Sequence, residues 1–301
     1  MTQTLRKPEW LRKKMNLHEL REMKSLLREH NVHTVCESAS CPNMSECFKK
    51  RTATFMIMGD ICTRGCRFCG VTKSNPLPLD KNETKNIVKI VNELGLEYVV
   101  ITSVTRDDIH DGGAGHFADV VGCVRKECKK VKGIEVLVPD FYARAEQKNL
   151  IQLKIKLIIE QGISVFGHNI ETVPRLYKKA RQGSDYQRSL DVLSAVKNVD
   201  ENCVTKSGIM LGLGETREEI IDALRALKNA GCDIVLFGQY LAPSNLHISV
   251  ERYVDPSEFL ELENIALDMG FRGAQAGPYV RSSYKAMEIW RKICSSNVRE
   301  K

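Results

Sequence analysis

Three closely spaced cysteines are the residues of this chain best suited to chemistry. Cys62, Cys66 and Cys69 have the spacing C-x3-C-x2-C and follow a short apolar run, residues 55–58, that is long enough for one buried strand. A loop loosened by glycines lets the three thiolates converge on a single inorganic cluster. In a 4Fe–4S cluster, three cysteines leave one iron without a protein ligand. That iron is a place where a small molecule can bind and be cleaved.

This spacing, with the aromatic Phe68 directly before the last cysteine, resembles the signature of the radical S-adenosylmethionine (radical SAM) enzymes. The resemblance implies that the open iron chelates the amino and carboxylate groups of S-adenosylmethionine. One electron from the cluster then releases a 5′-deoxyadenosyl radical, which abstracts hydrogen from an unactivated carbon. The alternative is a structural zinc site. Such sites normally use four ligands in two spaced pairs, and no second pair accompanies this triplet.

A second triplet precedes the first. Cys36, Cys41 and Cys47 have the spacing C-x4-C-x5-C, and the small residues, proline and asparagine within residues 38–43 are expected to break regular structure there. As a zinc site, this triplet would also lack a fourth ligand nearby in the sequence. Two three-cysteine sites separated by a strand are more economically two iron–sulfur clusters. The second cluster could relay electrons, anchor a substrate or supply sulfur.

A glycine-rich stretch in the middle of the chain is a candidate for binding the cofactor. Residues 207–215, SGIMLGLGE, resemble the radical SAM motif G-x-I-x-G-x-x-E that packs beside adenine, which makes Gly208, Gly212 and Glu215 candidates. A phosphate-binding loop is the alternative, but its G-K-[ST] sequence is absent.

Further polar residues follow predicted strands. Asp107 comes after the second strand and suits the methionine amino group of the cofactor. Asn169, Glu171 and Lys206 lie at strand ends and could hold its ribose or carboxylate. His168 fits packing or hydrogen bonding better than acid–base catalysis.

The elements that must position these residues alternate between strands and helices. Apolar, mostly β-branched runs predict six strands, at residues 55–58, 98–102, 135–138, 164–166, 204–211 and 234–237. Amphipathic stretches predict helices at residues 82–94, 117–130, 150–160, 185–196, 215–229 and 257–269, and an earlier helix at 16–30 behind a possible Asn16 cap.

Such repeated βαβ units predict an α/β fold, a partial (β/α)6 TIM-type barrel with an N-terminal helical and cysteine-loop extension and a C-terminal tail. We expect the extension at 1–53, the barrel at 54–276 and the tail at 277–301, as one structural unit. In such barrels the chemistry lies at the C-terminal ends of the strands. The first cysteine triplet follows the first strand, so motif and fold agree.

Composition narrows the class of protein. The chain has 301 residues, 43% hydrophobic and 28% charged, with eleven cysteines. No apolar stretch approaches the roughly 18–20 residues of a membrane span, and no secretory signal is recognisable. Eleven cysteines without such a signal favour a reducing compartment and metal chemistry, so we expect a cytoplasmic protein. Five cysteines fall in helical or strand patterns and fit small core residues: Cys123, Cys128, Cys203, Cys232 and Cys294.

The net charge is +7, and the first 14 residues are rich in lysine and arginine. Such a terminus could steer the chain to an acidic protein, a nucleic acid or a membrane, or simply be solvated. The basic residues are not interleaved with aromatic residues for base stacking, so we expect no nucleic-acid partner. We expect no membrane partner either.

The ordered set of motifs narrows the resemblance to the lipoyl synthase family. The second triplet is followed by the stretches RTATFMIMGDICTRGCRFC, ITSVTRDDIHDGGAGHF, HNIETVPRLY, KSGIMLGLGET, GQYLAPS and GPYVRSSYKA. Together they cover the chain from Lys7 to about Ala286. The resemblance implies insertion of two sulfur atoms, at carbons 6 and 8 of an octanoyl group that is amide-linked to a lysine of a lipoyl carrier domain.

The resemblance also implies cofactors and partners. Two 4Fe–4S clusters and S-adenosylmethionine are implied, with the cluster on Cys36, Cys41 and Cys47 consumed as the sulfur donor. A serine of the R-S-S-Y motif, Ser283 here, is implied as a ligand of that cluster. The implied partners are the carrier domains of 2-oxoacid dehydrogenase complexes and the glycine-cleavage H protein, an electron donor such as ferredoxin or flavodoxin, and an iron–sulfur carrier that rebuilds the cluster.

Other classes of protein remain as alternatives: another radical SAM sulfur-inserting enzyme, a non-catalytic iron–sulfur protein, or a zinc-binding interaction module. RNA methylthiotransferases carry additional nucleic-acid-binding domains, for which this chain has no room. A barrel with a cofactor motif exceeds what electron transfer alone requires. Colourless purified protein would favour the zinc module.

Overall fold

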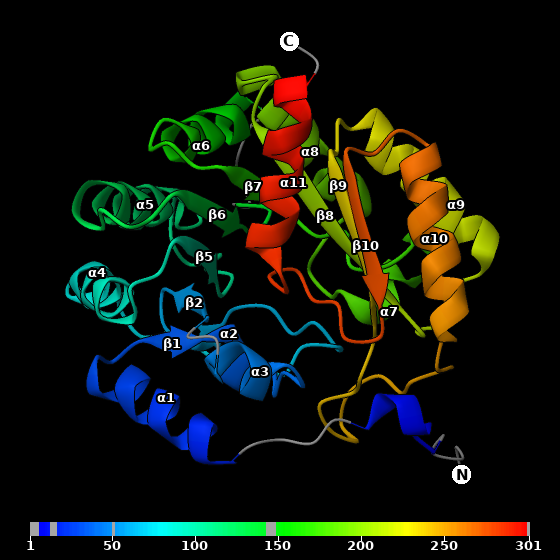
Figure 1. Cartoon of the computed structure of the whole chain (residues 1–301), viewed down its shortest axis with the longest axis horizontal. Coiled ribbons are helices and arrows are strands. Elements are labelled where there is room, and N and C mark those ends of the chain that lie inside the picture. Colours follow the sequence, from blue (N-terminus) through cyan, green and yellow to red (C-terminus); the bar gives the residue numbers. More distant parts are fainter. Residues whose placement is uncertain (1–5, 13–16, 50–51, 143–148, 300–301) are drawn as a thin grey trace.

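The centre of the molecule is a curved sheet of eight strands (Figure 1). The structure is a computed structural model that describes residues 6–12, 17–49, 52–142 and 149–299. The strand order is β1-β2-β5-β6-β7-β8-β9-β10, with β1 antiparallel to β2 and every later pair parallel. Within the described part of the chain, β1 and β10 stand at opposite ends of this order, so the barrel is open.

The strands are β1 (His33–Thr34), β2 (Thr54–Ile57), β5 (Tyr98–Ser103), β6 (Gly133–Leu137), β7 (Val165–Gly167), β8 (Val204–Leu211), β9 (Ile234–Gln239) and β10 (Gly273–Gly277). A separate short pair is formed by β3 (Ile61–Cys62) and β4 (Thr72–Lys73).

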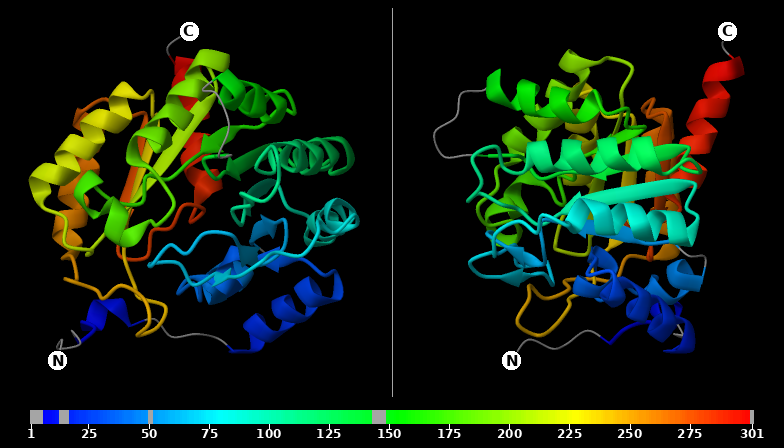
Figure 2. Two further views of the ribbon diagram at one scale, coloured as in Figure 1. Left: turned by 180° about the vertical axis from the view of Figure 1, so that it is seen from behind. Right: turned by 90° about the vertical axis from the view of Figure 1, so that its left-hand side faces the viewer.

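Helices follow most strands and cover the outer face of the sheet (Figure 2). They are α4 (Glu83–Leu94), α5 (Ala114–Glu127), α6 (Asn149–Ile159), α8 (Tyr186–Val199), α9 (Arg217–Asn229) and α10 (Pro256–Asp268). The N-terminal part contains η1 (Glu9–Leu11), α1 (Leu17–Glu29), α2 (Val35–Ser38) and α3 (Met44–Lys49). Two short helices, η2 (Pro174–Leu176) and α7 (Tyr177–Ala180), follow β7. The C-terminal tail contains α11 (Ala286–Arg299). Among the described residues, no helix combines the length and the apolar character that crossing a membrane requires.

Local sequence signals begin and end these helices. Thr216 and Glu219 form a capping box at the start of α9, in which each side chain bonds the backbone N–H of the other residue. Asp185 and Asp255 cap α8 and α10 through their carboxylates. Helix α4 ends at Gly95, whose φ of 63° is readily adopted by glycine.

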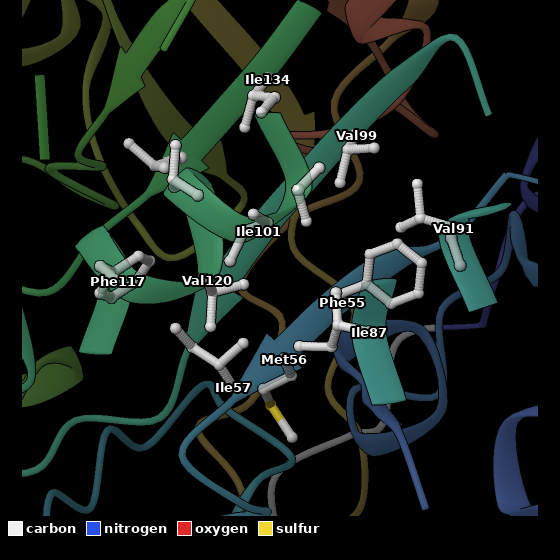
Figure 3. Packing of buried hydrophobic residues seen from close by; sticks show 14 of the residues in the cluster. Phe55, Met56, Ile57, Ile87, Val91, Val99, Ile101, Phe117, Val120 and Ile134 are labelled. Atoms are coloured by element: carbon white, nitrogen blue, oxygen red, sulfur yellow. The ribbon is translucent and has the colours of Figure 1, made fainter. Parts of the chain in front are cut away.

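The core lies between the sheet and its outer helices (Figure 3). Phe55 and Ile57 of β2 and Ile101 of β5 point outward and pack with Ile87 of α4 and Val120 of α5. All five side chains are at most 1% exposed. Burying each one stabilises the fold by about 1.5–3 kcal/mol. Because side chains alternate along a strand, the residues between them face the inside of the barrel.

Helix α11 packs on this inner face. Tyr98 and Val100 of β5 contact Ala286 and Trp290, and the rings of Tyr98 and Trp290 have centroids 5.4 Å apart. On the other side of the barrel, Ile293 packs with strand β9. The last helix therefore joins both sides of the open barrel from within (Figure 1).

The predicted α/β partial barrel is confirmed, and all six predicted strands are present within a few residues. A seventh parallel strand, β10, was not predicted because its sequence GAQAG has no β-branched residue. The tail contains the long helix α11, which the sequence analysis did not predict. The possible Asn16 cap lies outside the described residues.

The cysteines give one confirmed expectation and one correction. Regular structure is broken at residues 39–43, within the stretch 38–43 where a break was expected, while Cys36 and Cys47 lie on the short helices α2 and α3. Of the cysteines expected in the core, Cys294 is exposed on α11 and Cys123 is half-buried. A cysteine at the edge of the apolar face of a helix can be buried or exposed. The spacing of apolar residues alone does not determine which of the two applies.

Because α11 joins both sides of the barrel, truncating Trp290 should weaken the whole fold. We expect Trp290→Ala to lower the free energy of unfolding by about 2–4 kcal/mol, since a large half-buried aromatic contact is lost. Arg291→Ala, at an exposed neighbour, should change it by less than about 0.5 kcal/mol. Urea unfolding followed by circular dichroism measures both. Equal stability of the two variants would contradict the bridging role of α11.

Candidate active site

The chain turns sharply between β2 and the first cysteine triplet. Met58 and Gly59 both have positive φ, 67° and 84°. The buried carboxylate of Glu83 accepts hydrogen bonds from both backbone N–H groups, at 2.8 and 3.2 Å, and contacts His116 Nε2 at 2.6 Å. The guanidinium of Arg106 donates to the Met58 carbonyl at 3.2 Å. Such a left-handed non-glycine residue persists only where its surroundings hold it, and these bonds do so.

The thiols of the first triplet lie close enough to influence one another. Burial raises the pKa of Cys66 to about 12, and the neighbouring Cys69 and Cys62 add to this rise. Burial likewise raises the pKa of Cys69 to about 11. The Cys62 sulfur accepts backbone N–H groups of Arg64 and Thr105, each at 3.4 Å. Burial disfavours the thiolate forms of Cys66 and Cys69, so the donor set fits a metal cluster whose positive charge would hold the sulfurs as thiolates.

A buried ion-pair network fixes this cysteine loop to the barrel. Arg64 donates to both oxygens of Asp107 and both oxygens of Asp140, at 2.7–2.9 Å. Although burial raises the pKa of Asp140, the bonds and charge of Arg64 outweigh it and hold that pKa well below its usual range. Asp107, expected at the cofactor amino group, thus has both oxygens engaged with Arg64. Its contact with a cofactor stays a prediction.

Three of the predicted cofactor-binding residues meet: Asn169 and Glu171 follow β7, and they lie beside Gly208 in the middle of β8. The amide of Asn169 donates to Glu171 Oε1 at 3.1 Å and to Ser282 Oγ at 2.7 Å. A Cβ added at Gly208 would lie 3.0 Å from Asn169 Oδ1, so the amide rests directly on the glycine. Burial raises the pKa of Glu171, against the charge of Arg181 and the bond from Asn169.

The other predicted cofactor residues have structural partners. Glu215 accepts the backbone N–H groups of Gly212 and Leu213 at 2.6 and 2.9 Å, and so shapes its own loop. Lys206 is 2% exposed and pairs with Glu135, which is 1% exposed. The hydroxyl of Tyr98 donates to the same carboxylate at 3.0 Å. Lys206 therefore belongs to a buried polar layer inside the barrel, two residues before Gly208 on β8.

His168 is fully buried, as expected for a packing residue. Its Nδ1 lies 2.9 Å from the Val138 carbonyl. Burial and the charge of Arg181 lower the pKa of His168 to about 3, so the ring remains neutral at working pH.

The second triplet lies beside the start of β2. Burial raises the pKa of Cys36 to about 12, and Cys41 and then Cys47 contribute further. Thr54, the first residue of β2, acts against this rise in the pKa of Cys36. The Thr54 hydroxyl also donates to Ser283 Oγ at 2.6 Å. The structure thus brings the predicted ligand Ser283 next to a residue that lies beside the helix carrying Cys36.

The C-terminal tail is fixed to this cysteine loop on both sides of Ser283. The Asn43 side chain donates to the Tyr279 carbonyl at 2.6 Å. The hydroxyl of Tyr284 donates to Glu46 at 3.1 Å. These contacts join residues 236 and 238 positions apart in the chain.

The two cysteine loops touch. A Cβ added at Gly70 would lie 2.9 Å from the Ser38 carbonyl oxygen and 3.6 Å from Ala39 Cα. His247 Nε2 lies 3.0 Å from the Cys69 carbonyl, so the loop after β9 also packs against the first triplet. Among the described residues, no three His, Cys, Asp or Glu side chains are grouped to hold a single metal ion. A cluster of several irons holds its ligand sulfurs farther apart than one ion does.

Sequence reasoning missed four residues that organise the site: Arg64, Glu83, Thr54 and Arg181. Arg64 lies between the first two cysteines of the motif, which was a usable signal. Glu83 and Arg181 act through tertiary contacts that no local pattern reveals. Thr54 looked like the ordinary first residue of a strand.

Comparison with known proteins agrees with this geometry. The sequence profile of the radical SAM superfamily matches residues 56–227. In solved structures, Streptococcus suis SuiB bound to its precursor peptide SuiA has a TM-score of 0.55 at 12% identity, with 95% of this chain and 60% of that chain covered. SuiB bound to S-adenosylmethionine has a TM-score of 0.53 at 12% identity, covering 78% of this chain and 54% of that one. At this identity the likeness concerns the fold alone.

The chain is therefore a radical SAM protein, a class whose members use a 4Fe–4S cluster and S-adenosylmethionine. Its sequence is 50% identical to a lipoyl synthase of Caldanaerobacter subterraneus, over 94% of this chain and 96% of that protein. It is 52% identical to one of Methylobacillus flagellatus, over 94% of this chain and 85% of that protein. The chain belongs to the lipoyl synthase family and is an enzyme of the radical SAM class, which confirms the resemblance in the sequence.

The contact between Asn169 and Gly208 gives a test of the cofactor site. Gly208→Ala places a Cβ 3.0 Å from Asn169 Oδ1 and should displace that amide. We expect the Kd for S-adenosylmethionine to rise roughly tenfold. Displacing a polar group that is positioned to contact a ligand lowers the affinity by about that factor or more. Iron content should not change.

Gly273→Ala is the matched control, because a Cβ there meets only ordinary contacts of 3.4–3.6 Å on the same inner face. Equilibrium dialysis with labelled cofactor measures both variants. An unchanged Kd in Gly208→Ala would remove Asn169 from the cofactor site.

Proposed function

We propose that this chain is a lipoyl synthase that inserts two sulfur atoms, at carbons 6 and 8, into an octanoyl group carried on a lysine of a lipoyl carrier domain. The observation that carries the proposal is the extent of the match to curated lipoyl synthases, about half of all residues over 94% of the chain. The match to these relatives covers 94% of the chain, whereas the superfamily profile covers only residues 56–227.

The chemistry of the substrate supports this assignment. A saturated carbon has no acidic proton and no leaving group, so general acid–base or nucleophilic catalysis cannot begin the reaction. When bound, the reduced cluster with S-adenosylmethionine supplies a radical that removes hydrogen from such a carbon. The protein residues bind, orient and shield the reactants.

We assign the two triplets different tasks. Cys62, Cys66 and Cys69 hold the cluster that binds S-adenosylmethionine, and the Arg64 network keeps their loop rigid. Cys36, Cys41 and Cys47, with Ser283, hold a second 4Fe–4S cluster that supplies sulfur. Oxygen is a harder ligand than thiolate and suits sulfur-rich iron less well, which fits a ligand that must be released.

The cofactor contacts follow from the polar groups at the strand ends. Asn169 and Glu171 offer an amide and a carboxylate beside Gly208, and these suit the ribose and amino groups of S-adenosylmethionine. Asp107 and Lys206 act there only if their present partners, Arg64 and Glu135, release them. Gly212 and Glu215 shape the backbone beside adenine.

We further propose that residues 1–53, 54–276 and 277–301 work as one unit. The bonds between Asn43 and Tyr279 and between Glu46 and Tyr284 support this, because they join the extension to the tail. The net charge of +7 favours acidic partners, which suits a carrier domain and a small electron-transfer protein such as ferredoxin or flavodoxin. An iron–sulfur carrier would rebuild the second cluster. No nucleic acid is required.

The first triplet is tested by removing it. Cys62, Cys66 and Cys69 all changed to Ala should lower the iron of anaerobically reconstituted protein from about eight to about four atoms per chain. Cleavage of S-adenosylmethionine should stop, because the remaining cluster would have no position for it. Iron analysis and chromatography of 5′-deoxyadenosine measure these outcomes. Continued release of 5′-deoxyadenosine would show that the assignment of this triplet is wrong.

Removing the second triplet should separate the two tasks. With Cys36, Cys41 and Cys47 changed to Ala, the first triplet should still support 5′-deoxyadenosine formation after reduction, while no sulfur reaches an octanoylated carrier domain. Mass spectrometry of the carrier measures the added sulfur. Lipoyl product from this variant would eliminate the second cluster as the sulfur source and favour an external sulfur donor.

A further inference from the structure

Thr54 occupies the junction between the second cysteine triplet and the C-terminal tail. It is the first residue of β2, faces the inside of the barrel and is 4% exposed. Its hydroxyl donates to Ser283 Oγ at 2.6 Å, a normal distance for an O–H···O bond, from a residue 229 positions away. Strand β1, which leads directly into α2 and Cys36, pairs with β2 at Thr34 and Phe55, so Thr54 lies beside the helix that carries Cys36. Thr54 thus lies beside the helix that carries one member of the triplet and bonds the serine assigned to the same site.

Other contacts place the backbone of the tail but leave the serine side chain to be oriented. Tyr279 and Tyr284 are held by Asn43 and Glu46, on either side of Ser283. A serine side chain has three staggered positions about χ1, and a fixed backbone does not by itself select one. The Thr54 hydroxyl, on the wall of the barrel, selects one of these positions for Ser283 by donating a hydrogen bond to its oxygen.

The residue type at position 54 suits this task. Threonine is β-branched, so its χ1 is restricted and its side chain fits a strand. Its backbone is held by the parallel pairing of Thr54 with Val100 on β5. A hydroxyl on such a stiff support holds its direction better than one on a loop.

We propose that Thr54 is a positioning residue that directs the Ser283 hydroxyl at the site formed by Cys36, Cys41 and Cys47. This proposal rests on the proposed function, because it takes Ser283 as a ligand of the second cluster. Thr54 acts through Ser283, so its removal should weaken the hold on one iron without removing the cluster.

The test measures how fast the second cluster loses iron to a ferrous chelator after reduction. It uses full-length chains in which Cys62, Cys66 and Cys69 are already Ala, so that only the second cluster contributes. Thr54→Val keeps the shape of the side chain and removes the hydroxyl. We expect iron release about five- to tenfold faster, the effect of losing one hydrogen bond. Thr54→Ser restores the hydroxyl and should stay within about twofold of the parent chain.

A double-mutant comparison separates positioning from general destabilisation. Ser283→Ala should speed release at least as much as Thr54→Val, and the double variant should be no faster than Ser283→Ala alone, because both changes remove one interaction. Thr205→Val, on β8, removes a buried hydroxyl that bonds the Gly231 carbonyl in the turn before β9, and it should leave the release rate unchanged. If Thr54→Val folds poorly, Thr54→Ala carries the same expectation.

Mössbauer spectra of the intact enzyme, labelled with ⁵⁷Fe, give an independent readout. The signal of the iron that has an oxygen ligand should be lost or broadened in Thr54→Val and kept in Thr54→Ser. A normal signal and a normal release rate in Thr54→Val, with both altered in Ser283→Ala, would overturn the role of Thr54 alone. Normal behaviour of Ser283→Ala would instead overturn the ligand assignment in the proposed function, and the role of Thr54 with it.

Discussion

The two halves of the candidate site depend on one pair of adjacent hydroxyls in the tail. Ser282 accepts the Asn169 amide at 2.7 Å, and Ser283 accepts the Thr54 hydroxyl at 2.6 Å. The first bond leads to Glu171 and the cofactor-binding strands, and the second leads to the second cysteine triplet. Neither half can move relative to the other without breaking a bond to the tail. This geometry suits a reaction in which a radical formed on one side must meet sulfur held on the other.

Holding the tail at the second triplet requires closing a very long loop. The packing of α11 offsets the entropy that this closure costs. The closure entropy grows only with the logarithm of loop length, about 0.6 kcal/mol for each doubling. Burial of Ile293 and the contact of Trp290 with Tyr98 can offset a cost of that size. The bonds from Asn43 and Glu46 then hold Tyr279 and Tyr284 of the tail against the second cysteine loop. The last helix is therefore part of the site, although it contributes no ligand.

The sequence predicted what local chemistry determines. Cysteine spacing identified both triplets, and buried β-branched runs identified six strands, because both signals lie within a few residues. Strand β10 was missed since GAQAG lacks such residues and is held by pairing with β9 and by packing of α10. Thr54 and Glu83 were missed because their roles arise from contacts across the fold. The family resemblance supplied Ser283, which no periodicity or spacing could have singled out.

The two triplets meet the same electrostatic difficulty in a similar way. Burial raises the pKa of Cys36 in the second triplet and of Cys66 and Cys69 in the first, so forming those thiolates requires nearby positive charge. A half-buried arginine lies near each triplet: Arg181 opposes the rise in the pKa of Cys66, and Arg281 interacts with Cys41. Burial lowers the pKa of Arg281 itself, and the Cys41 charge counteracts this. At Cys66 the guanidinium favours the thiolate, and a site that binds its metal group gains the attraction of an arginine already in place.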